Sequence, residues 1–492
     1  MGKVIGIIVV LALAIFMAVL TCKSKHNDLF KWVGIVIFVA FCFTWVLPYG
    51  QFQSGTFYEA GMNRLGLNDI PQLLYYAVYF CLTTILYLFA IGGFYGVLSK
   101  TKSYQALVKK WSKFVTGKEV PVSIILIILL AALTSILKST LILLVFVPFL
   151  ISVLLNAKFD KITTMGLTFG SILVGSIAGT YGTDSLYWFN NYANSTVTVG
   201  IYHRLIISLI ALVLFVGYNV YRVLKMKKNK IKNAGIEDDP FVIEDVKGKT
   251  KTWPMVVIFV FLFIFVILGY INWNANWGIE SFNKFHTWLT ELSIGKEFNL
   301  FSYILGTGSV AFGMMEVSNM IVVLILLSIL VASIGRLKPS EFVTSFCEGL
   351  GRLIRPVCLY ALTYMIFIIT YMTPFVPTIT DWAFSLTKKF NPFIALLTGF
   401  ISSIFHSDLG YTSYLVSSVL TVKYASDFNL LHTIYVTTYG LVQIFVPIGG
   451  LLLFGLAYLK LDYKSWFKYI WIFALAMLIV MLIFVAIVKY AM

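Results

Sequence analysis

The sequence predicts an all-α polytopic membrane protein with about ten transmembrane helices and two oppositely oriented re-entrant hairpins, built as an inverted repeat. Three observations predict this fold class. The 492-residue chain is 60% hydrophobic and 12% charged, with a mean hydropathy of +0.90, and apolar runs of about 20 residues recur along it. A short polar stretch occurs twice, each time inside an apolar run. Lys and Arg gather in short loops beside these runs, so the formal charge of +16 indicates membrane topology rather than a nucleic-acid partner.

The first apolar run, Val4 to Thr21, is predicted to be an anchor helix with its N-terminus outside. One lysine precedes the run and three follow it, which is the reverse of the charge bias of a cleaved signal peptide. Residues 1–31 are therefore an extra anchor helix and a cytoplasmic loop. The positive-inside rule then predicts that 32–47 crosses outward, that 48–71 is an outer loop and that 73–98 crosses inward.

The next segment, Ser99 to Glu119, carries six lysines and is predicted to lie on the cytoplasmic side. Its apolar residues recur at helical spacing, which indicates an amphipathic helix on the inner membrane surface; they are Tyr104, Leu107, Val108 and Trp111. A hairpin that follows this segment therefore opens to the cytoplasm.

The repeated polar stretch marks the two predicted hairpins. It occurs at Thr134 to Leu141 and at Ser402 to Leu409, with four of eight positions identical. About a dozen apolar residues lead to the first tip, fewer than the roughly 20 of a spanning helix, so we expect re-entrant hairpins near 121–155 and 393–422 whose tips meet in mid-membrane. The alternative is a pair of ordinary tilted helices joined by a turn, with hydroxyls bonded to their own backbone carbonyls.

Glycines interrupt the span at 163–183, which favours close packing or an unwound turn. An outer loop at 183–198 and a return at 201–224 complete a first repeat, residues 32–224. The basic segment 225–251 is the predicted linker between the halves.

The linker leads to a crossing at 253–271 and a long outer loop at 272–299, so that 225–300 forms one connecting unit. This odd crossing inverts the second repeat, residues 301–492. The second repeat is predicted to begin as an interfacial helix that turns inward near Gly313. Its hairpin opens to the outside, its next span breaks near Pro447, and the C-terminus lies outside.

Two sequence matches share nearly one offset, which supports the repeat. Ser403 follows Ser135 by 268 residues, and Thr438 follows Thr168 by 270. Inverted repeats with discontinuous elements at the midplane are the architecture of secondary transporters.

Polar residues of the tips and broken spans are the predicted substrate- and ion-binding residues. The N–H groups of half-helices suit a carboxylate, whereas hydroxyls and freed carbonyls suit Na+ or a solute's polar groups. The set is Thr134, Ser135, Lys138, Ser139, Thr140, Thr180, Thr183, Asp184, Ser402, Ser403, His406, Ser407, Asp408, Thr438 and Gln443.

Three ionisable residues each have two interpretations. Lys138 is a counter-charge for an anionic substrate, or it extends to an interface or pairs with Asp408. His406 is a proton relay, or it is simply hydrogen-bonded. Glu316 caps a helix or lines the transport path.

The sequence contains no enzyme motif. A complete Gly-x-x-x-x-Gly-Lys-Ser/Thr phosphate loop, a nucleophile–base pair and an HExxH motif are all missing, and the five cysteines lack metal-ligand spacing. We therefore expect no bound cofactor or metal and a transport process driven by Na+, by H+ or by exchange.

Three regions resemble the YfcC-like branch of the C4-dicarboxylate anaerobic carrier (DcuC-type) family, within the ion transporter superfamily. They are Ile91 to Val97 with Gly117 to Glu119, His406 to Tyr414, and Pro447 to Gly450 with Trp466 to Lys468. The resemblance implies a secondary carrier for small carboxylates or amino acids, usually homo-oligomeric. Relatives include arginine/ornithine exchangers.

The sequence departs from the family pattern at the predicted site. Leu137 and Lys138 stand where such carriers usually have small residues and paired acids. An Asn-Pro near the first broken span is replaced around Gly182 to Asp184, and the second tip reads His406 to Gly410. The substrate is therefore not copied from the family.

The sequence thus predicts a multi-pass cell-membrane transporter for a small carboxylate-bearing solute such as a dicarboxylate, a short-chain organic acid or an amino acid. Its predicted partners are the lipid bilayer, the solute and further copies of the chain. The first alternative is a basic amino acid exchanger of arginine/ornithine type, in which Asp184, Glu316 and Asp408 bind the cationic group. The second is a membrane scaffold that transports nothing.

Overall fold

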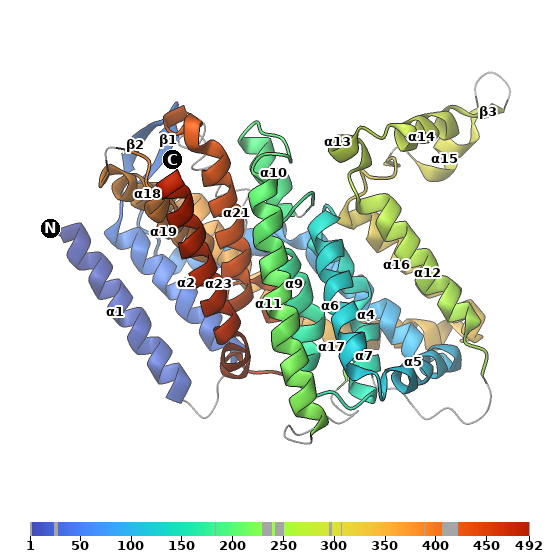
Figure 1. Cartoon of the computed structure of the whole chain (residues 1–492). Helices are drawn as coiled ribbons and strands as arrows, with labels where there is room; N and C mark the ends of the chain where they lie inside the picture. The colour runs from blue at the N-terminus through green and yellow to red at the C-terminus, as the bar shows by residue number, and fades with distance from the viewer. Residues whose placement is uncertain are drawn as a thin grey trace.

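The protein is a helical bundle with little sheet (Figure 1). The computed structural model describes residues 2–23, 28–182, 184–228, 239–241, 250–294, 298–306, 308–387, 389–405 and 422–491. At residues 2–5, 22–23, 184–185, 188 and 489–491 it describes the backbone alone.

Residues before the linker form eleven α-helices, two strands and three short helical turns within the described ranges. They are α1 (Gly2–Lys23), α2 (Leu29–Val46), β1 (Tyr49–Gln53), β2 (Thr56–Gly61), η1 (Leu67–Asp69), α3 (Ile70–Phe80), α4 (Leu82–Ser99), α5 (Lys102–Val115), α6 (Glu119–Ile136), η2 (Thr140–Val145), α7 (Val147–Asn156), α8 (Lys161–Met165), the π-helical η3 (Gly166–Gly170), α9 (Ser171–Gly175), α10 (Asp184–Tyr192) and α11 (Ile201–Lys227).

The described residues after the linker form a second series of helices and one very short hairpin. They are α12 (Trp253–Tyr270), α13 (Trp273–Trp277), α14 (Ser281–Glu291), β3 (Ser293–Ile294), β4 (Phe298–Asn299), α15 (Leu300–Leu305), α16 (Val317–Gly335), α17 (Pro339–Met372), α18 (Val376–Ser385), α19 (Pro392–Phe405), η6 (Ala425–Asp427), α21 (Phe428–Phe445), α22 (Gly450–Tyr458) and α23 (Tyr463–Ala491).

The polytopic helical fold class is confirmed. Within the described ranges, nine helical segments are long and apolar enough to cross a membrane. The predicted span at 163–183 is not among them, because it ends as a helix at Gly175 and continues as irregular backbone. Conversely, α6 is among the nine segments, although the sequence predicted only a hairpin arm of about a dozen residues there.

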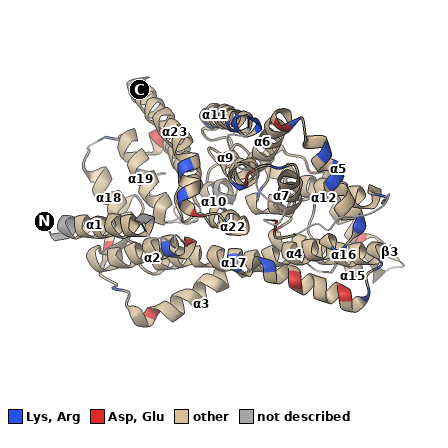
Figure 2. Cartoon of the chain, turned by 90° about the horizontal axis from the view of Figure 1, so that it is seen from below, with Lys and Arg blue, Asp and Glu red and all other residues tan. Residues whose placement is uncertain are grey.

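The lysine-rich end of the bundle is held together by polar contacts. Lys227 at the end of α11 pairs with Glu119 at the start of α6, with Nζ and Oε2 2.9 Å apart. Ser112 of the amphipathic helix α5 donates its hydroxyl to the carbonyl of Val153 in α7. Figure 2 views this end from below, where Lys and Arg colour α5 and parts of α11 and α23. By the positive-inside rule this end is the predicted cytoplasmic side.

The helix α6 is shorter than α11, against which it packs. At 1.5 Å per residue, its 18 residues span about 27 Å, whereas the 27 residues of α11 span about 40 Å. Both begin or end at the lysine-rich end, and α7 returns toward it. The tip therefore ends below the far end of α11. That the hairpin is re-entrant stays a prediction, because 18 residues also approach the length of a spanning helix.

Three of the predicted outer loops contain secondary structure, and there the loop prediction was wrong. The segment 48–71 folds into the antiparallel pair β1–β2, in which Gln51 faces Tyr58. The segment 183–198 contains α10, and 272–299 contains α13 and α14 (upper right in Figure 1). Their Trp, Tyr and Phe side chains are typical of elements that lie at a membrane interface.

The second broken span is confirmed near Pro447. The helix α21 ends at Phe445 and α22 begins at Gly450. The carbonyl oxygens left free by this break find side-chain donors in α23: Trp466 Nε1 lies 2.9 Å from the oxygen of Ile444, and Tyr463 Oη lies 2.5 Å from that of Phe445. The buried backbone at the break is thereby satisfied.

A short helix and a turn lie where the sequence predicts an interfacial start and an inward turn, and their position relative to the membrane stays a prediction. The short helix α15 ends at Leu305, Gly313 has a φ of +91°, and α16 begins at Val317.

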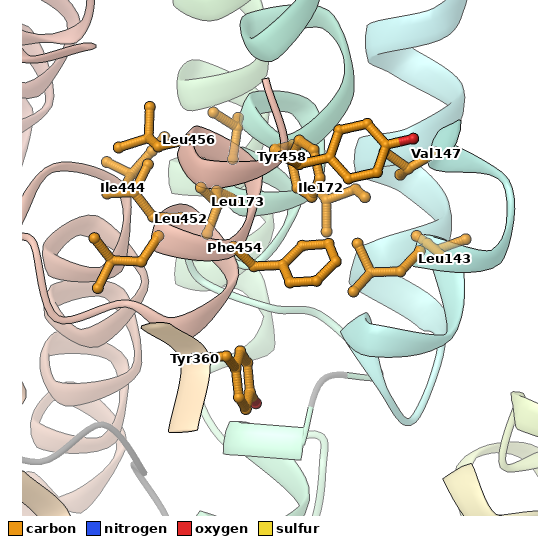
Figure 3. Close-up of a cluster of buried hydrophobic side chains, with 14 of the residues drawn as sticks. Leu143, Val147, Ile172, Leu173, Tyr360, Ile444, Leu452, Phe454, Leu456 and Tyr458 are labelled. Atoms are coloured by element: carbon orange, nitrogen blue, oxygen red, sulfur yellow. The ribbon is translucent and has the colours of Figure 1, made fainter. Parts of the chain in front are cut away.

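Apolar side chains from the two series of helices share one core. Figure 3 shows Leu143 and Val147 beside Phe454 and Tyr458 of α22, with Ile172 of α9 between them. All five are nearly inaccessible. The break regions of the two halves therefore pack directly against each other.

Candidate functional site

The first predicted tip meets the first broken span. The carbonyl oxygen of Ser135, near the end of α6, accepts hydrogen bonds from the amides of Tyr181 at 3.1 Å and Gly182 at 2.9 Å. The hydroxyls of Ser135 and Thr180 lie 2.6 Å apart. The sequence placed Ser135 and Thr180 in one site, and the structure brings them together.

Two glycines allow this close approach. A Cβ atom on Gly175, where α9 ends, would lie 2.7 Å from the Cα of Ala131 in α6. A Cβ atom on Gly182 would overlap the carbonyl of Leu137 at the tip itself. Because real Cβ atoms do not approach this closely, only glycine lets the unwound backbone lie against α6.

A cavity of about 590 Å³ opens beside this contact. Its described lining comes from the tip, from α10 and the turn after it, and from α13: Ile136, Lys138, Tyr181, Gly182, Leu186, Tyr187, Asn190, Asn191, Asn194, Ser195, Thr196, Val197, Thr198, Asn272, Ala275 and Asn276. These residues include one cation, five asparagines and no carboxylate. Such a lining is suited to an anionic solute with several hydrogen-bond acceptors.

Lys138 is held at the edge of this cavity. Its backbone amide donates to the carbonyl of Tyr270 at 2.7 Å, which attaches the tip to the end of α12. Its ammonium lies 5.2 Å from the ring centroid of Tyr187 in α10. The ammonium group of Lys138 therefore lies at the cavity, next to a ring that also lines it. This position favours the counter-charge interpretation over extension to an interface.

Asn190 presents amide donors to the cavity. Its Oδ1 atom is engaged by the hydroxyl of Ser195 at 3.0 Å and by Nε2 of the buried His432 at 2.9 Å. Because the oxygen is occupied by two partners, the amide nitrogen is the group left for a solute. Across the cavity, Asn276 uses its own amide to hold the carbonyl of Tyr181 at 3.2 Å.

The other polar residues of the first tip lie outside the described lining of the cavity. Thr134 donates its hydroxyl to the carbonyl of Leu130, one turn earlier, at 2.8 Å, as the alternative interpretation expected. Ser139 is buried and Thr140 begins η2, half-buried. None of the three lines the cavity. Their role in binding stays a prediction.

The second tip is described only in part. Ser403 donates to the carbonyl of Gly399 at 2.6 Å, and Thr438 donates to that of Ile434 at 2.8 Å. Both hydroxyls are therefore back-bonded within their own helices. Ser402 Oγ and Gln443 Nε2 are buried and have no hydrogen-bond partner within the described part of the chain. Unpaired buried polar atoms are the groups that a solute, ion or water would satisfy.

Several predicted residues remain without a described side chain. Thr183, His406, Ser407 and Asp408 lie outside the described residues. Asp184 begins α10, and its backbone alone is described.

Glu316 is the N-cap of α16. Its amide donates to Oδ1 of Asn319 at 2.8 Å, its carbonyl accepts from the Tyr270 hydroxyl at 2.8 Å, and the residue is exposed. The contacts favour the capping interpretation over the path interpretation.

Sequence reasoning missed four residues near the cavity: Asn190, Asn276, His432 and Arg204. A signal existed for Arg204, because an arginine inside an apolar helix deserves a functional hypothesis by default. The asparagines lay in segments predicted to be plain loops, where no periodicity indicated which side chains would converge.

The described ranges contain nine helical segments of membrane length, and a polar cavity lies beside a broken span. These features are typical of a polytopic membrane carrier. The chain belongs to the C4-dicarboxylate anaerobic carrier (DcuC) family, whose model matches residues 1–490. The family resemblance predicted from the sequence is therefore confirmed, and the family is one of carriers rather than enzymes.

No curated protein matches the chain. A solved structure, that of the YdaH transporter from Alcanivorax borkumensis, is 12% identical and covers 92% of this chain and 97% of its own, with a TM-score of 0.38.

Proposed function

We propose that this protein is a secondary carrier that binds a small carboxylate-bearing anion in the cavity between the first tip, α10 and α13. The single observation that carries the proposal is the cavity lining. Lys138 is the one charged residue among its described lining residues, and five asparagines line the same cavity. Membership of the DcuC family supports a C4 dicarboxylate as the first solute to test.

The chemistry of the cavity fits a carboxylate. An ammonium and amide N–H groups donate hydrogen bonds, and such bonds to an ionised acceptor are roughly twice as strong as neutral ones. The aromatic ring of Tyr187 adds an apolar wall against a carbon chain. A second carboxylate of the solute would reach the asparagines of α10 and of the turn after it.

We expect the energy to come from Na+, H+ or exchange. The unpaired hydroxyl of buried Ser402 supports a polar site in the second half, because hydroxyl oxygens suit Na+, whereas the unpaired Nε2 of Gln443 is a donor that suits an oxygen of the solute. Uptake of labelled succinate into proteoliposomes with an imposed Na+ gradient, an imposed pH gradient or internal succinate distinguishes the three modes.

The carboxylate proposal is tested with Lys138→Met. We expect succinate uptake to fall by about tenfold or more, since a charge-assisted contact contributes roughly 1.5–3 kcal/mol. The matched control is Lys110→Met, because Lys110 is exposed on α5 at the lysine-rich end and should leave uptake unchanged. Unaltered succinate uptake by Lys138→Met would contradict the role of this cation.

The same liposomes test the two alternatives. Uptake of labelled arginine, stimulated by internal ornithine and unaffected by Lys138→Met, would identify a basic amino acid exchanger. A scaffold would be favoured by two results together: neither solute is taken up, and the bulky substitution Ser135→Leu leaves the thermal unfolding midpoint unchanged.

A further inference from the structure

Arg204, in the first turn of α11, is a fully buried cation. Its Nη1 atom donates to the carbonyl oxygens of Gly179 and Thr180, the latter at 3.1 Å. Its Nη2 atom donates to those of Val197 and Val199, the latter at 3.0 Å. Four backbone carbonyls from two separate segments therefore converge on one guanidinium.

No carboxylate among the described side chains pairs with this arginine. Arg222, further along α11, shows the usual solution, since its guanidinium lies 3.0 Å from Oδ2 of Asp160. Burial of a cation is costly unless other polar groups replace its water. For Arg204 the compensating groups are backbone carbonyl dipoles. Its guanidinium is therefore surrounded by the same kind of oxygen ligands that coordinate a free cation.

Two of those carbonyls belong to the part of the chain where a carrier usually holds its coupling cation. Gly179 and Thr180 lie in the irregular stretch 176–182, between the end of α9 and the start of α10. Unwound backbone carbonyls at such breaks are the groups that coordinate Na+ in secondary transporters. Here a side chain of the protein already occupies them.

We propose that Arg204 is a tethered cation that fills the carbonyl site of the first broken span, so that no free coupling cation binds there. The statement about the coupling cation rests on the proposed carrier function. A cation-driven cycle would then use its free ion in the second half of the molecule.

The tethered cation also positions the solute cavity. Thr180 gives its carbonyl to Arg204 and its hydroxyl to Ser135, and the next two amides donate to the carbonyl of Ser135. Arg204 therefore holds the unwound stretch against the tip that carries Lys138. It is a positioning residue, because it does not line the cavity itself.

The test is chemical rescue of purified full-length Arg204→Ala in detergent, without solute. We expect its thermal unfolding midpoint to fall by about 5 °C or more, because four carbonyls lose a charged partner. Guanidinium chloride at millimolar concentration should restore at least half of this loss, whereas tetramethylammonium chloride at equal ionic strength corrects for screening, because its cation cannot donate hydrogen bonds to the carbonyls. The wild type, whose site is filled, should gain nothing.

Matched variants separate a cation site from a general loss of packing. Arg64→Ala removes an exposed arginine and should show neither the loss nor the rescue. Arg204→Lys keeps the charge without the planar fork and should lie between wild type and Arg204→Gln. If Arg204→Ala does not fold, Arg204→Gln takes its place in the rescue.

Two results would overturn the proposal: wild-type stability of Arg204→Ala, or an equal response of all variants to guanidinium. A larger stabilisation of Arg204→Ala than of wild type by Na+ would support it, because the vacated carbonyls would then accept a free cation. Since no solute is present, these outcomes do not depend on whether the chain carries carboxylates.

Discussion

Neighbouring residues of the first tip have different partners. Thr134 bonds to its own helix, whereas Ser135 joins the tip to Thr180, 45 positions later. Both are hydroxyl residues in one apolar run, so composition does not distinguish them. The direction of each side chain around α6, and the segment that packs against it, decide which hydroxyl joins the site.

A residue of the predicted cytoplasmic linker is also buried. Asp239 accepts a hydrogen bond from Ser152 of α7 at 2.5 Å and one from the amide of Phe241 at 2.9 Å. Arg352 of α17 donates to the carbonyl of Pro240 at 3.0 Å. The three linker residues 239–241 therefore attach to helices of both halves. Burial raises the pKa of Asp239 to about 7, and the nearby Arg352 opposes this rise.

This attachment should depend on pH. The pKa of Asp239 is higher in the attached state than its ordinary value of 3.8, so attachment is strongest below that value and weakens as pH rises to about 7. We expect the protection of the Phe241 amide against hydrogen exchange, corrected for intrinsic rates, to fall by up to about tenfold per pH unit in this window.

Asp239→Asn is the control for the pH effect, because its amide does not titrate. Its protection should be flat across the same window. The other groups that face Asp239 are Arg352 and the tyrosines Tyr95, Tyr104 and Tyr458. A pH dependence that persists in Asp239→Asn would assign the titration to a different group.

At the scale of elements, helices α4 and α17 are joined through glycines. A Cβ atom on Gly349 of α17 would overlap the carbonyl of Gly92 and would lie 2.9 Å from the Cα of Gly96. Close backbone approach of this kind is how membrane helices gain packing contacts where lipid offers no hydrophobic drive.

Gly349→Ala should therefore destabilise the protein. Overpacking usually costs about 1–3 kcal/mol, and here the obstacle is backbone rather than a flexible side chain. Gly351→Ala on the same helix is the matched control, because nothing lies within 4 Å of its Cβ position, and it should be neutral or gain up to about 1 kcal/mol. Thermal unfolding in detergent measures both, and equal midpoints would contradict the close-packing account.

The long apolar segments and their breaks were predictable from the sequence, whereas the short helices outside them were not. The break near Pro447 followed from Pro and Gly, which interrupt the backbone ladder locally. The helices α10, α13 and α14 were missed, because short interfacial helices rich in Asn and Trp lack the long apolar period of a span. Asn190 and Asn191 of α10 and Asn276 of α13 line the cavity.

At the scale of the whole molecule, the two halves pack through their broken spans. Gly440 of α21 allows this, since a Cβ atom there would lie 2.8 Å from the Cα of Ile177. The irregular stretch 176–182 that borders the cavity is therefore part of the contact between the two halves. The domain boundaries and the inverted repeat stay predictions.

The orientation of the chain is open to a direct test. The positive-inside rule predicts that both termini lie outside and that the linker after α11 lies inside. Alkaline phosphatase fused after Met492 should be active when the chain is expressed in a bacterial host, because the enzyme works only outside the cytoplasm. A fusion truncated at Lys228 should be inactive, and the opposite pattern would invert the topology.

The sequence by itself determined that this is a polytopic membrane carrier, because transfer of an apolar run into lipid is a local property of that run. It also singled out Ser135 and Thr180, which meet where the first tip contacts the first break, and Lys138, which lines the cavity beside this contact. Only the tertiary structure decided that asparagines of α10 and α13 complete the cavity and that Arg204 fills the carbonyls of the first break. These choices depend on contacts between distant segments, and no local pattern of residues encodes which buried polar groups will satisfy one another.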